Sequence, residues 1–484
     1  MAAEPPRDRH SGNHMNFRRY MPLHRDAATL AMVLAGTVMG TSTAHAQAVT
    51  DLDYIDPGIQ QPTARHELFN DRDNGIRLSG GLSFYGYGAT TRNLNFGSSR
   101  GIDGATPTGK HPAWWELSAT PTLRGEIDTG QSVIFAGVVG VGSMTRGNAY
   151  GDASGATPDH PEHTRLDQAY IGWRSGSLLN DSLGEDALTF SFGRQQFMFG
   201  EGFLVGDGYT DTGKYGGYWN GPSQGFKNAA IASIDSHGWH GDLFHLEQDQ
   251  YVQGGPDEET SANGINAEYT FTDRAKIGGA WLRTYDSDIA GRDGMDVWNV
   301  RLKGRPLANV PGLALGGQYV SQKNRDADID DEGWYVQATY TFQDAPWSPE
   351  IAYRHARFSE NYDTLFYEFA GGWGNWFMGE ITGEYMLFNS NMKIDMLRAS
   401  VSPRDDLETG IIGYRFRLDD PQSVGASDAD FAREINLYAD WNVSEQVTLS
   451  GVYAVSFPDE GARSRFGGND HTSQLFELFA TYTF

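Results

Sequence analysis

Cationic residues recur at every second position in several segments of this sequence, and that spacing puts side chains on one face of a β-strand. Rings of Arg and Lys on the wall of a pore select anionic solutes. We therefore predict an anion path, with Tyr414, Phe416 and Leu418 facing away from the neighbouring cations. The predicted pore-lining cations are Arg124, Arg301, Lys303, Arg305, Arg354, Arg415 and Arg417.

Charge neutralisation is the alternative explanation for these cations. A charged residue on a membrane-spanning strand must face inward in any case, since Arg or Lys toward lipid costs about 2–4 kcal/mol at the midplane. Inward acids would then pair with the cations without selecting any solute. The candidate acids are Glu116, Glu126, Glu268, Glu434 and Asp440.

Other chemistries find little support in the sequence. The chain has no cysteine, which excludes disulfides, thiol catalysis and Cys-ligated metals. It also lacks the G-x-S-x-G and H-E-x-x-H motifs. An acidic stretch at 326–332 is similar to a calcium loop, but Asp331 stands where an EF-hand requires Gly and Gln337 where it requires Glu. We predict no enzymatic activity, no metal and no cofactor.

The charge balance argues against a nucleic-acid partner. The chain has 37 Lys and Arg against 63 Asp and Glu, a formal net charge of −26. Phosphate recognition needs a basic surface, and no block of Lys and Arg supplies one locally.

The first 46 residues have the features of a signal peptide. Met15 opens a basic stretch with Arg18 and Arg19, an apolar run follows at 27–40, and small residues surround position 46. About 14 apolar residues are too few for a spanning helix, which needs about 20. We predict residues 1–46 to be a signal peptide with its true start at Met15, and residues 47–75 to be a short leader.

From residue 76 onward the apolar residues alternate with polar ones. In the stretch 115–127 the odd positions are apolar and the even positions polar, as expected of a strand with one face in lipid and one in water. About nineteen such segments follow, and because bacterial barrels have an even strand number we predict 18.

Short and long connections alternate between these segments. Turns such as 128–130 and 442–445 are brief, whereas loops such as 146–164, 200–223 and 324–332 are long and polar. Trp and Tyr, including Trp114 and Tyr170, gather at strand ends, as in interfacial girdles. The sequence therefore predicts an all-β, transmembrane antiparallel β-barrel over residues 76–484, with short periplasmic turns and long extracellular loops.

The C-terminus adds to this prediction. Phe476, Leu478, Ala480, Tyr482 and Phe484 are apolar at every second position, and the chain ends on Phe484. This arrangement resembles the signal read by the machinery that assembles barrels in the outer membrane of Gram-negative cells. We expect that machinery and outer-membrane lipid to be partners of the protein, and we expect the protein to be a monomer.

Several motifs, taken in order, resemble the alginate export family of outer-membrane porins. They are residues 165–174 (RLDQAYIGWR), 190–196 (FSFGRQQ) and 225–229 (GFKNA), with later stretches at 391–418 and 434–437. The resemblance implies an 18-stranded barrel whose cationic lumen passes a polyuronate, an anionic polysaccharide, out of the cell by passive diffusion. It also brings Arg174 and Arg194 into the predicted set of solute-binding cations.

Arg194 needs an additional hypothesis. Phe190 and Phe192 are expected to face lipid, so strict alternation would turn Arg194 outward, and we hypothesise that a bulge at Gly193 turns it inward. Two other functions stay open at this point: a porin that takes up small anionic oligosaccharides, and a closed structural or adhesive surface barrel.

Overall fold

The computed structural model describes residues 66–148, 152–153, 160–211, 213–251, 256–271, 274–368 and 378–484. The predicted signal peptide lies outside the described residues. Short helical segments are η3 (Leu94–Gly97), η4 (Gly383–Leu387) and α2 (Glu460–Arg465). Among the described residues, no helix is long and apolar enough to cross a membrane.

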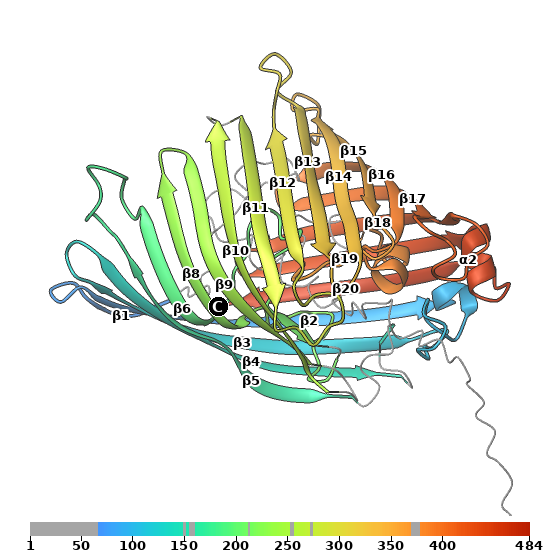
Figure 1. Ribbon diagram of the computed structural model, residues 1–484, viewed down its shortest axis with the longest axis horizontal. Helices are drawn as coiled ribbons and strands as arrows, with labels where there is room; N and C mark the ends of the chain where they lie inside the picture. Colours follow the sequence, from blue (N-terminus) through green and yellow to red (C-terminus); the bar gives the residue numbers. More distant parts are fainter. Residues whose placement is uncertain are drawn as a thin grey trace, which may run out of the picture.

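Within the described residues, 20 strands form one sheet, and 18 of them close an antiparallel barrel once the short additions β1 and β7 are set aside (Figure 1). Strands adjacent along the chain pair with each other, and the ring closes because β2 pairs with both β3 and β20. The predicted fold class is confirmed. The barrel strands are β2 (Ile76–Arg92), β3 (Ala113–Asp128), β4 (Val133–Gly147), β5 (Glu162–Arg174), β6 (Leu188–Gln195), β8 (Phe226–Ser236), β9 (Trp239–Tyr251), β10 (Glu258–Phe271), β11 (Ala275–Tyr285), β12 (Asp296–Gly304), β13 (Leu313–Asn324), β14 (Ile329–Thr341), β15 (Glu350–Phe358), β16 (Met392–Arg404), β17 (Leu407–Leu418), β18 (Asp430–Ser444), β19 (Val447–Pro458) and β20 (Ser473–Thr483).

The two additional strands extend the wall locally. β1 (His66–Asp71) pairs with the start of β2 and continues the line of β20, so part of the predicted leader is a strand. The chain end meets it there: the rings of His66 and Phe484 lie 4.4 Å apart, and Phe484 exchanges backbone hydrogen bonds with Leu82 at 2.8 and 2.9 Å. β7 (Tyr209–Asp211) pairs in parallel with the end of β9.

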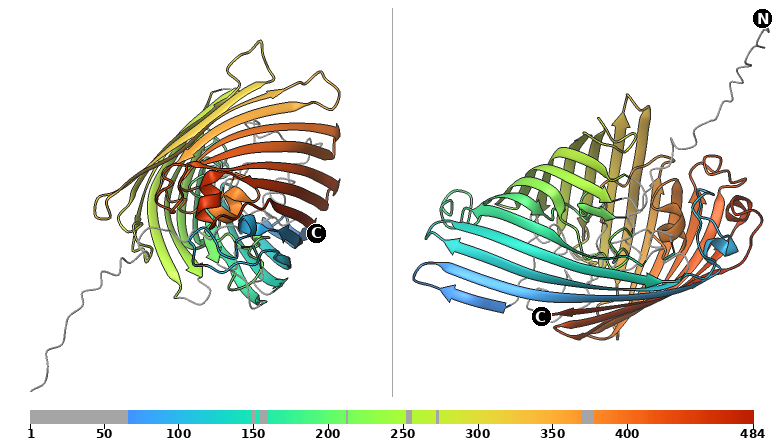
Figure 2. Two further views of the ribbon diagram at one scale, coloured as in Figure 1. Left: turned by 90° about the vertical axis from the view of Figure 1, so that its right-hand side faces the viewer. Right: turned by 90° about the horizontal axis from the view of Figure 1, so that it is seen from below.

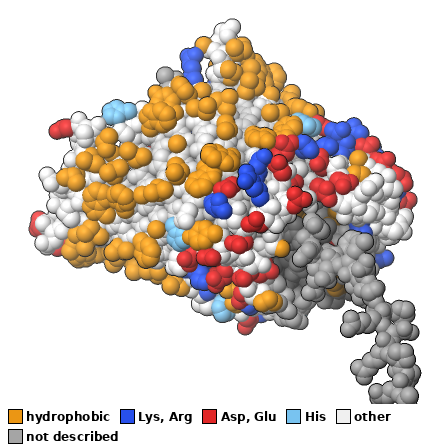
Figure 3. Space-filling view, viewed as in Figure 1, with side chains coloured by type: hydrophobic (Ala, Val, Ile, Leu, Met, Phe, Trp, Pro, Cys, Tyr) orange, Lys and Arg blue, Asp and Glu red, His pale blue; other side chains and the backbone are white. Residues whose placement is uncertain are grey.

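The alternation predicted from the sequence fixes the two faces of the wall. On β3, Trp115 and Leu117 are 44% and 51% exposed, whereas Glu116 between them is fully buried. On the face of the molecule shown in Figure 3, hydrophobic side chains lie over much of the wall. An apolar outer face around a polar inner one is the pattern of a barrel embedded in lipid.

The two rims differ as predicted. The turns 405–406 and 445–446 contain two residues each, whereas connections such as 93–112, 196–225 and 359–391 on the other rim are long. Two details depart from prediction. The expected loop 324–332 is mostly strand, because β13 and β14 run on to a four-residue connection at 325–328. Trp114 and Tyr170, expected in the girdle, face inward and are buried.

Candidate functional site: a barrel lumen narrowed by two loops

Two long loops fold into the barrel from nearly opposite sides of the wall. Loop 196–225 connects β6 with β8, and loop 359–391 connects β15 with β16. They meet through backbone hydrogen bonds: Phe366 N–H donates to the Leu204 carbonyl at 3.0 Å, and Glu368 N–H donates to the Gly202 carbonyl at 2.7 Å. The views along other axes show chain segments inside the curved wall (Figure 2). The lumen is therefore narrowed from two sides at once.

Loop 196–225 is held at both ends by inward-facing wall residues. The buried carboxylate of Glu116 on β3 accepts the backbone N–H groups of Trp219 and Asn220 at 2.7 and 2.8 Å. Toward the other side, Glu201 accepts from Lys303 on β12 and from the Tyr335 hydroxyl on β14, both at 2.8 Å. These contacts stretch the loop across the lumen.

Loop 359–391 is held in a similar way. Arg292, in the connection between β11 and β12, donates to both carboxylate oxygens of Asp363 at 2.7 and 2.8 Å. Farther along, Glu434 on β18 accepts the backbone N–H groups of Ile381 and Thr382 at 3.0 and 2.8 Å. Inward wall carboxylates thus receive backbone donors from both loops.

Aromatic packing joins the loops to each other and to the wall. The Trp219 ring lies 5.7 Å from Trp114 on β3 and 4.8 Å from Tyr385 on loop 359–391. Tyr385 also donates its hydroxyl to Glu477 on β20 at 2.6 Å. The middle of the lumen is consequently packed with buried rings.

Arg301, Lys303 and Arg354 face inward, as predicted. The Arg301 Nε donates to Glu268 at 2.7 Å, and the guanidinium lies 5.2 Å from the centre of the Phe199 ring. Lys303 pairs with Glu201 as described above. Arg354 is buried, donates from Nε to Gln337 at 2.8 Å and lies 4.8 Å from the centre of the Tyr335 ring.

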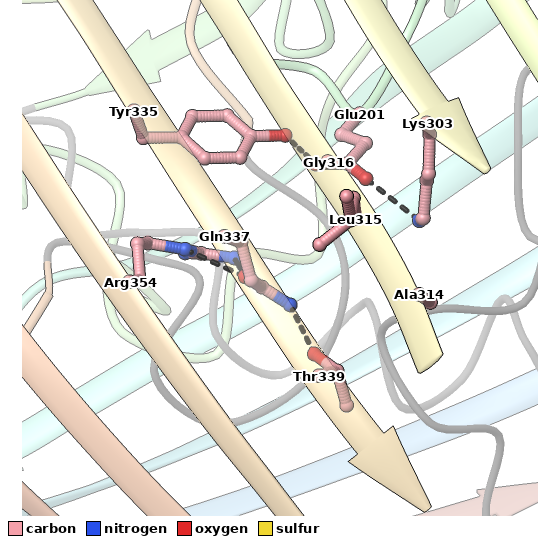
Figure 4. Close-up of a pocket in the computed structure, with 9 residues that line it drawn as sticks. All are labelled: Glu201, Lys303, Ala314, Leu315, Gly316, Tyr335, Gln337, Thr339 and Arg354. Carbon is pink, nitrogen blue, oxygen red and sulfur yellow. Dashed lines mark hydrogen bonds and ion pairs between the residues drawn. The ribbon is translucent and has the colours of Figure 1, made fainter. Parts of the chain in front are cut away.

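Lys303 and Arg354 line a small pocket between the wall and loop 196–225 (Figure 4). Lys303 and Arg354 contribute two cations, and Glu201 contributes one carboxylate. The neighbouring Lys303 holds the pKa of Glu201 below its usual value despite the burial of that carboxyl group. The pocket therefore carries an excess of positive charge, with Gln337, Tyr335 and Thr339 as neutral hydrogen-bonding groups.

Arg124 and Arg174 also face inward, near the rim of the short turns. Both approach Glu126, at 2.7 and 3.5 Å, and Arg174 also approaches Asp186 at 3.3 Å. Arg305 follows the last residue of β12 at the same rim and is half-buried. Arg124 and Arg174 are paired with acids, as the neutralisation alternative requires.

The prediction for Arg415 and Arg417 was wrong. The inward residues of β17 are Tyr414 and Phe416, which are 4% and 0% exposed, and the two arginines lie on the outer face, where they pair with Asp430 and Asp395 at 2.9 and 3.3 Å. Alternation separates two faces without saying which one meets lipid. Here the aromatic face points inward because it packs against loop 359–391.

The hypothesis about Arg194 is also not supported by the register. Arg194 pairs with Ala169, which in turn pairs with Val138, an exposed residue of the outer face. A ladder irregularity does lie at Gly193, but Gly193 itself takes the inward position opposite Tyr170. Arg194 donates from Nε to the Asp167 carbonyl at 2.9 Å near the end of β6.

Sequence reasoning missed several charged residues of the lumen. Arg398 on β16 is buried and pairs with Glu350 at 2.6 Å; its alternation with Leu397 and Ala399 was a usable signal. Arg292 had no comparable signal, because its partner Asp363 is 71 residues away in another loop.

Loop 359–391 brings further acids into the lumen, beyond the wall acids that the sequence indicated. Carboxylate oxygens of Glu380, Glu384 and Glu477 lie within 4.8 Å of one another, and all three residues are buried. Burial, followed by repulsion from Glu477, raises the pKa of Glu380 and Glu384 well above the usual value. Burial also raises the pKa of Glu368 to about 8. The lumen is therefore mixed in charge rather than uniformly cationic.

No protein-family model and no curated protein sequence match the chain. Several solved structures match the chain in fold. A BenF-like porin from Pseudomonas fluorescens Pf-5 has a TM-score of 0.55 at 11% identity, covering 84% of this chain and 98% of the porin. Acinetobacter baumannii OccAB1 has a TM-score of 0.54 at 13% identity, covering 88% and 99%. Pseudomonas aeruginosa OccD3 (OpdP) has a TM-score of 0.51 at 12% identity, covering 92% and 98%.

At these identities the likeness shows a shared fold. It confirms the predicted fold class, an 18-stranded barrel of the type found in Gram-negative outer-membrane porins. None of the three structures is described as an alginate exporter, so the resemblance to that family stays a prediction.

Proposed function

We propose that this protein is a substrate-selective porin that takes up small anionic solutes, of the size of a short acidic oligosaccharide, by passive diffusion. The observation that carries the proposal is the narrowed lumen, where loops 196–225 and 359–391 are bonded to each other beside a pocket with excess positive charge. The solved structures of similar fold named above include a porin, which supports a channel rather than an enzyme.

The size of the solute follows from the loops. A polymer that threads the barrel requires a continuous open bore along its length, whereas the two loops here share backbone hydrogen bonds and buried rings across the lumen. A small solute needs only local displacement of side chains. Uptake of small solutes is therefore favoured over export of an alginate chain, which rests on the sequence resemblance alone.

The sign of the solute charge depends on few residues. Arg124, Arg174 and Arg301 are paired with acids of the wall, and such pairs attract a passing anion weakly. In the pocket, Lys303 pairs with Glu201, whereas the buried Arg354 donates to the neutral side chain of Gln337. A solute carboxylate that replaced Glu201 on Lys303 would also take over the hydrogen bond that the Tyr335 hydroxyl now donates to Glu201.

Solute block of single channels tests the proposal. Uronate trisaccharide, neutral trisaccharide of equal length and long polyuronate are added in turn to the purified protein in a planar bilayer. We expect the acidic trisaccharide to block the current briefly, and Arg354→Gln to shorten these blocks at least about tenfold. The neutral trisaccharide should block the current for a shorter time than the acidic one. Arg283→Gln, which changes an arginine 53% exposed on the outer face, serves as the matched control.

Two results would overturn the proposal. Block by long polyuronate with no effect of the trisaccharide would favour polymer export. A complete absence of channel openings from correctly folded protein would favour the closed structural barrel.

A further inference from the structure

The outer face of β15, β16, β17 and β18 carries rows of residues that lie directly opposite one another on neighbouring strands. One row consists of His355, Asp395, Arg415 and Arg433. The row toward the long loops consists of Arg357, Lys393 and Arg417, and the row toward the short turns consists of Tyr353, Leu397, Gly413 and Ile435.

These rows mark the edge of the lipid-facing band. Every residue of the following row, Ile351, Ala399, Ile411 and Leu437, is apolar. The charged rows lie on the side of the long loops, which face the cell exterior in barrels of this class. They therefore stand at the level of the headgroups of the outer leaflet.

Within the charged row, Arg415 and Arg433 are directly opposite each other. Like charges in this position destabilise a sheet. Their side chains are 54% and 62% exposed, and each pairs with one acid, Asp430 or Asp459, at 2.9 Å. A guanidinium has five donors, so one carboxylate partner leaves donors available on both arginines. An anion between the two would remove the repulsion.

An open groove of about 420 Å³ begins directly below this pair of arginines. Its lining includes Tyr353, Leu397, Ile435 and Phe457, which are between 39% and 56% exposed. Its floor is Gly413, where a Cβ atom would meet no other atom within 4 Å. The groove is therefore apolar along its length, and its outer end holds the two arginines together with one carboxylate, Asp395.

We propose that this groove binds one phosphorylated acyl lipid of the outer leaflet. The acyl chain lies over Gly413 between Leu397 and Ile435, and the phosphate lies between Arg415 and Arg433. Arginine suits this role because its planar group binds phosphate through two parallel hydrogen bonds. The site is on the outside of the barrel and is independent of the solute pathway.

Native mass spectrometry of the full-length protein in detergent tests the site, with diphosphorylated lipid A as the probe. We expect one tightly held lipid. The double variant Arg415→Gln/Arg433→Gln and the groove-filling variant Gly413→Leu should each weaken binding at least about tenfold. Arg283→Gln and Gly88→Leu are matched controls: Arg283 is an exposed, acid-paired arginine elsewhere on the outer face, and a Cβ at Gly88 would also meet no atom within 4 Å.

Several outcomes would overturn the proposal. Equal binding by all four variants would show that the groove is not the site. Displacement of the lipid by millimolar inorganic phosphate would show a simple anion site, and equal binding of dephosphorylated lipid A would show that the arginines do not hold a phosphate. Because Gly413→Leu adds an apolar side chain at an open, lipid-facing position, its effect does not depend on a folding defect.

Discussion

Breaking the ion pair between Arg292 and Asp363 should release loop 359–391 from the wall. The two side chains are 1% and 7% exposed, and they are joined by two hydrogen bonds at 2.7 and 2.8 Å. Replacing one partner of such a pair leaves the other charge buried without compensation, which costs about 3–5 kcal/mol. Each 1.4 kcal/mol changes an equilibrium constant about tenfold. The ratio of in-folded to displaced loop should therefore fall at least about a hundredfold.

Single-channel recording in a planar bilayer measures this effect. Arg292→Met and Asp363→Asn should each give a larger mean conductance and more frequent switching between levels. The double variant Arg292→Met/Asp363→Asn is the control. It removes both charges and keeps a side-chain oxygen at position 363, where Asp363 accepts the Leu365 N–H at 2.7 Å. Its conductance should return toward that of the wild type.

Wild-type conductance and switching in both single variants, with normal folding, would be the contrary result. The ion pair would then not hold the loop in place. A double variant that behaves like the more severe single variant would show that the cost lies in packing rather than in an uncompensated charge.

Three further predictions follow from the described contacts. Burial raises the pKa of Glu368 to about 8, so the in-folded loop binds more protons than a displaced one, and its stability should fall, and the conductance rise, as the pH increases from 4.5 to about 8. Glu368→Gln should weaken this pH dependence in the conductance, while Glu380 and Glu384 of the same loop, whose pKa values are also raised, keep part of it. Gly193 has a φ of 127°, and a Cβ there would lie 2.4 Å from the Ala169 carbonyl, so Gly193→Ala should cost about 1–3 kcal/mol and lower the temperature at which the barrel unfolds on gels. Arg415→Glu lies on the outer face and should leave the ion selectivity of the channel unchanged, as measured by its reversal potential.

The barrel itself could be predicted from the sequence because its cause is local. Alternation in the stretch 115–127 places Leu117 in lipid and Glu116 in the lumen whatever the rest of the chain does, and the structure agrees. The same rule failed at β17. On β17 the apolar face could meet either lipid or the interior of the barrel, so alternation alone does not decide its orientation. Phe416 faces inward because it packs against loop 359–391, where a Cβ atom added at Gly379 would lie 2.5 Å from the Phe416 ring.

The loops inside the lumen could not be predicted. Their position depends on contacts between residues far apart in sequence, such as Trp219 with Glu116 and Gln224 with Glu368, which are separated by 103 and 144 positions. No local pattern marks these residues as partners. For the same reason, the sequence identified Lys303 as a lumen cation but not its partner Glu201.

The reversal potential of single channels in a KCl gradient tests most directly whether the narrowed pore prefers anions. We predict small unitary conductance with a preference for chloride, shifted toward potassium by the double variant Lys303→Gln/Arg354→Gln. A potassium preference that is the same in the wild type and in this variant would contradict an anion-preferring pore.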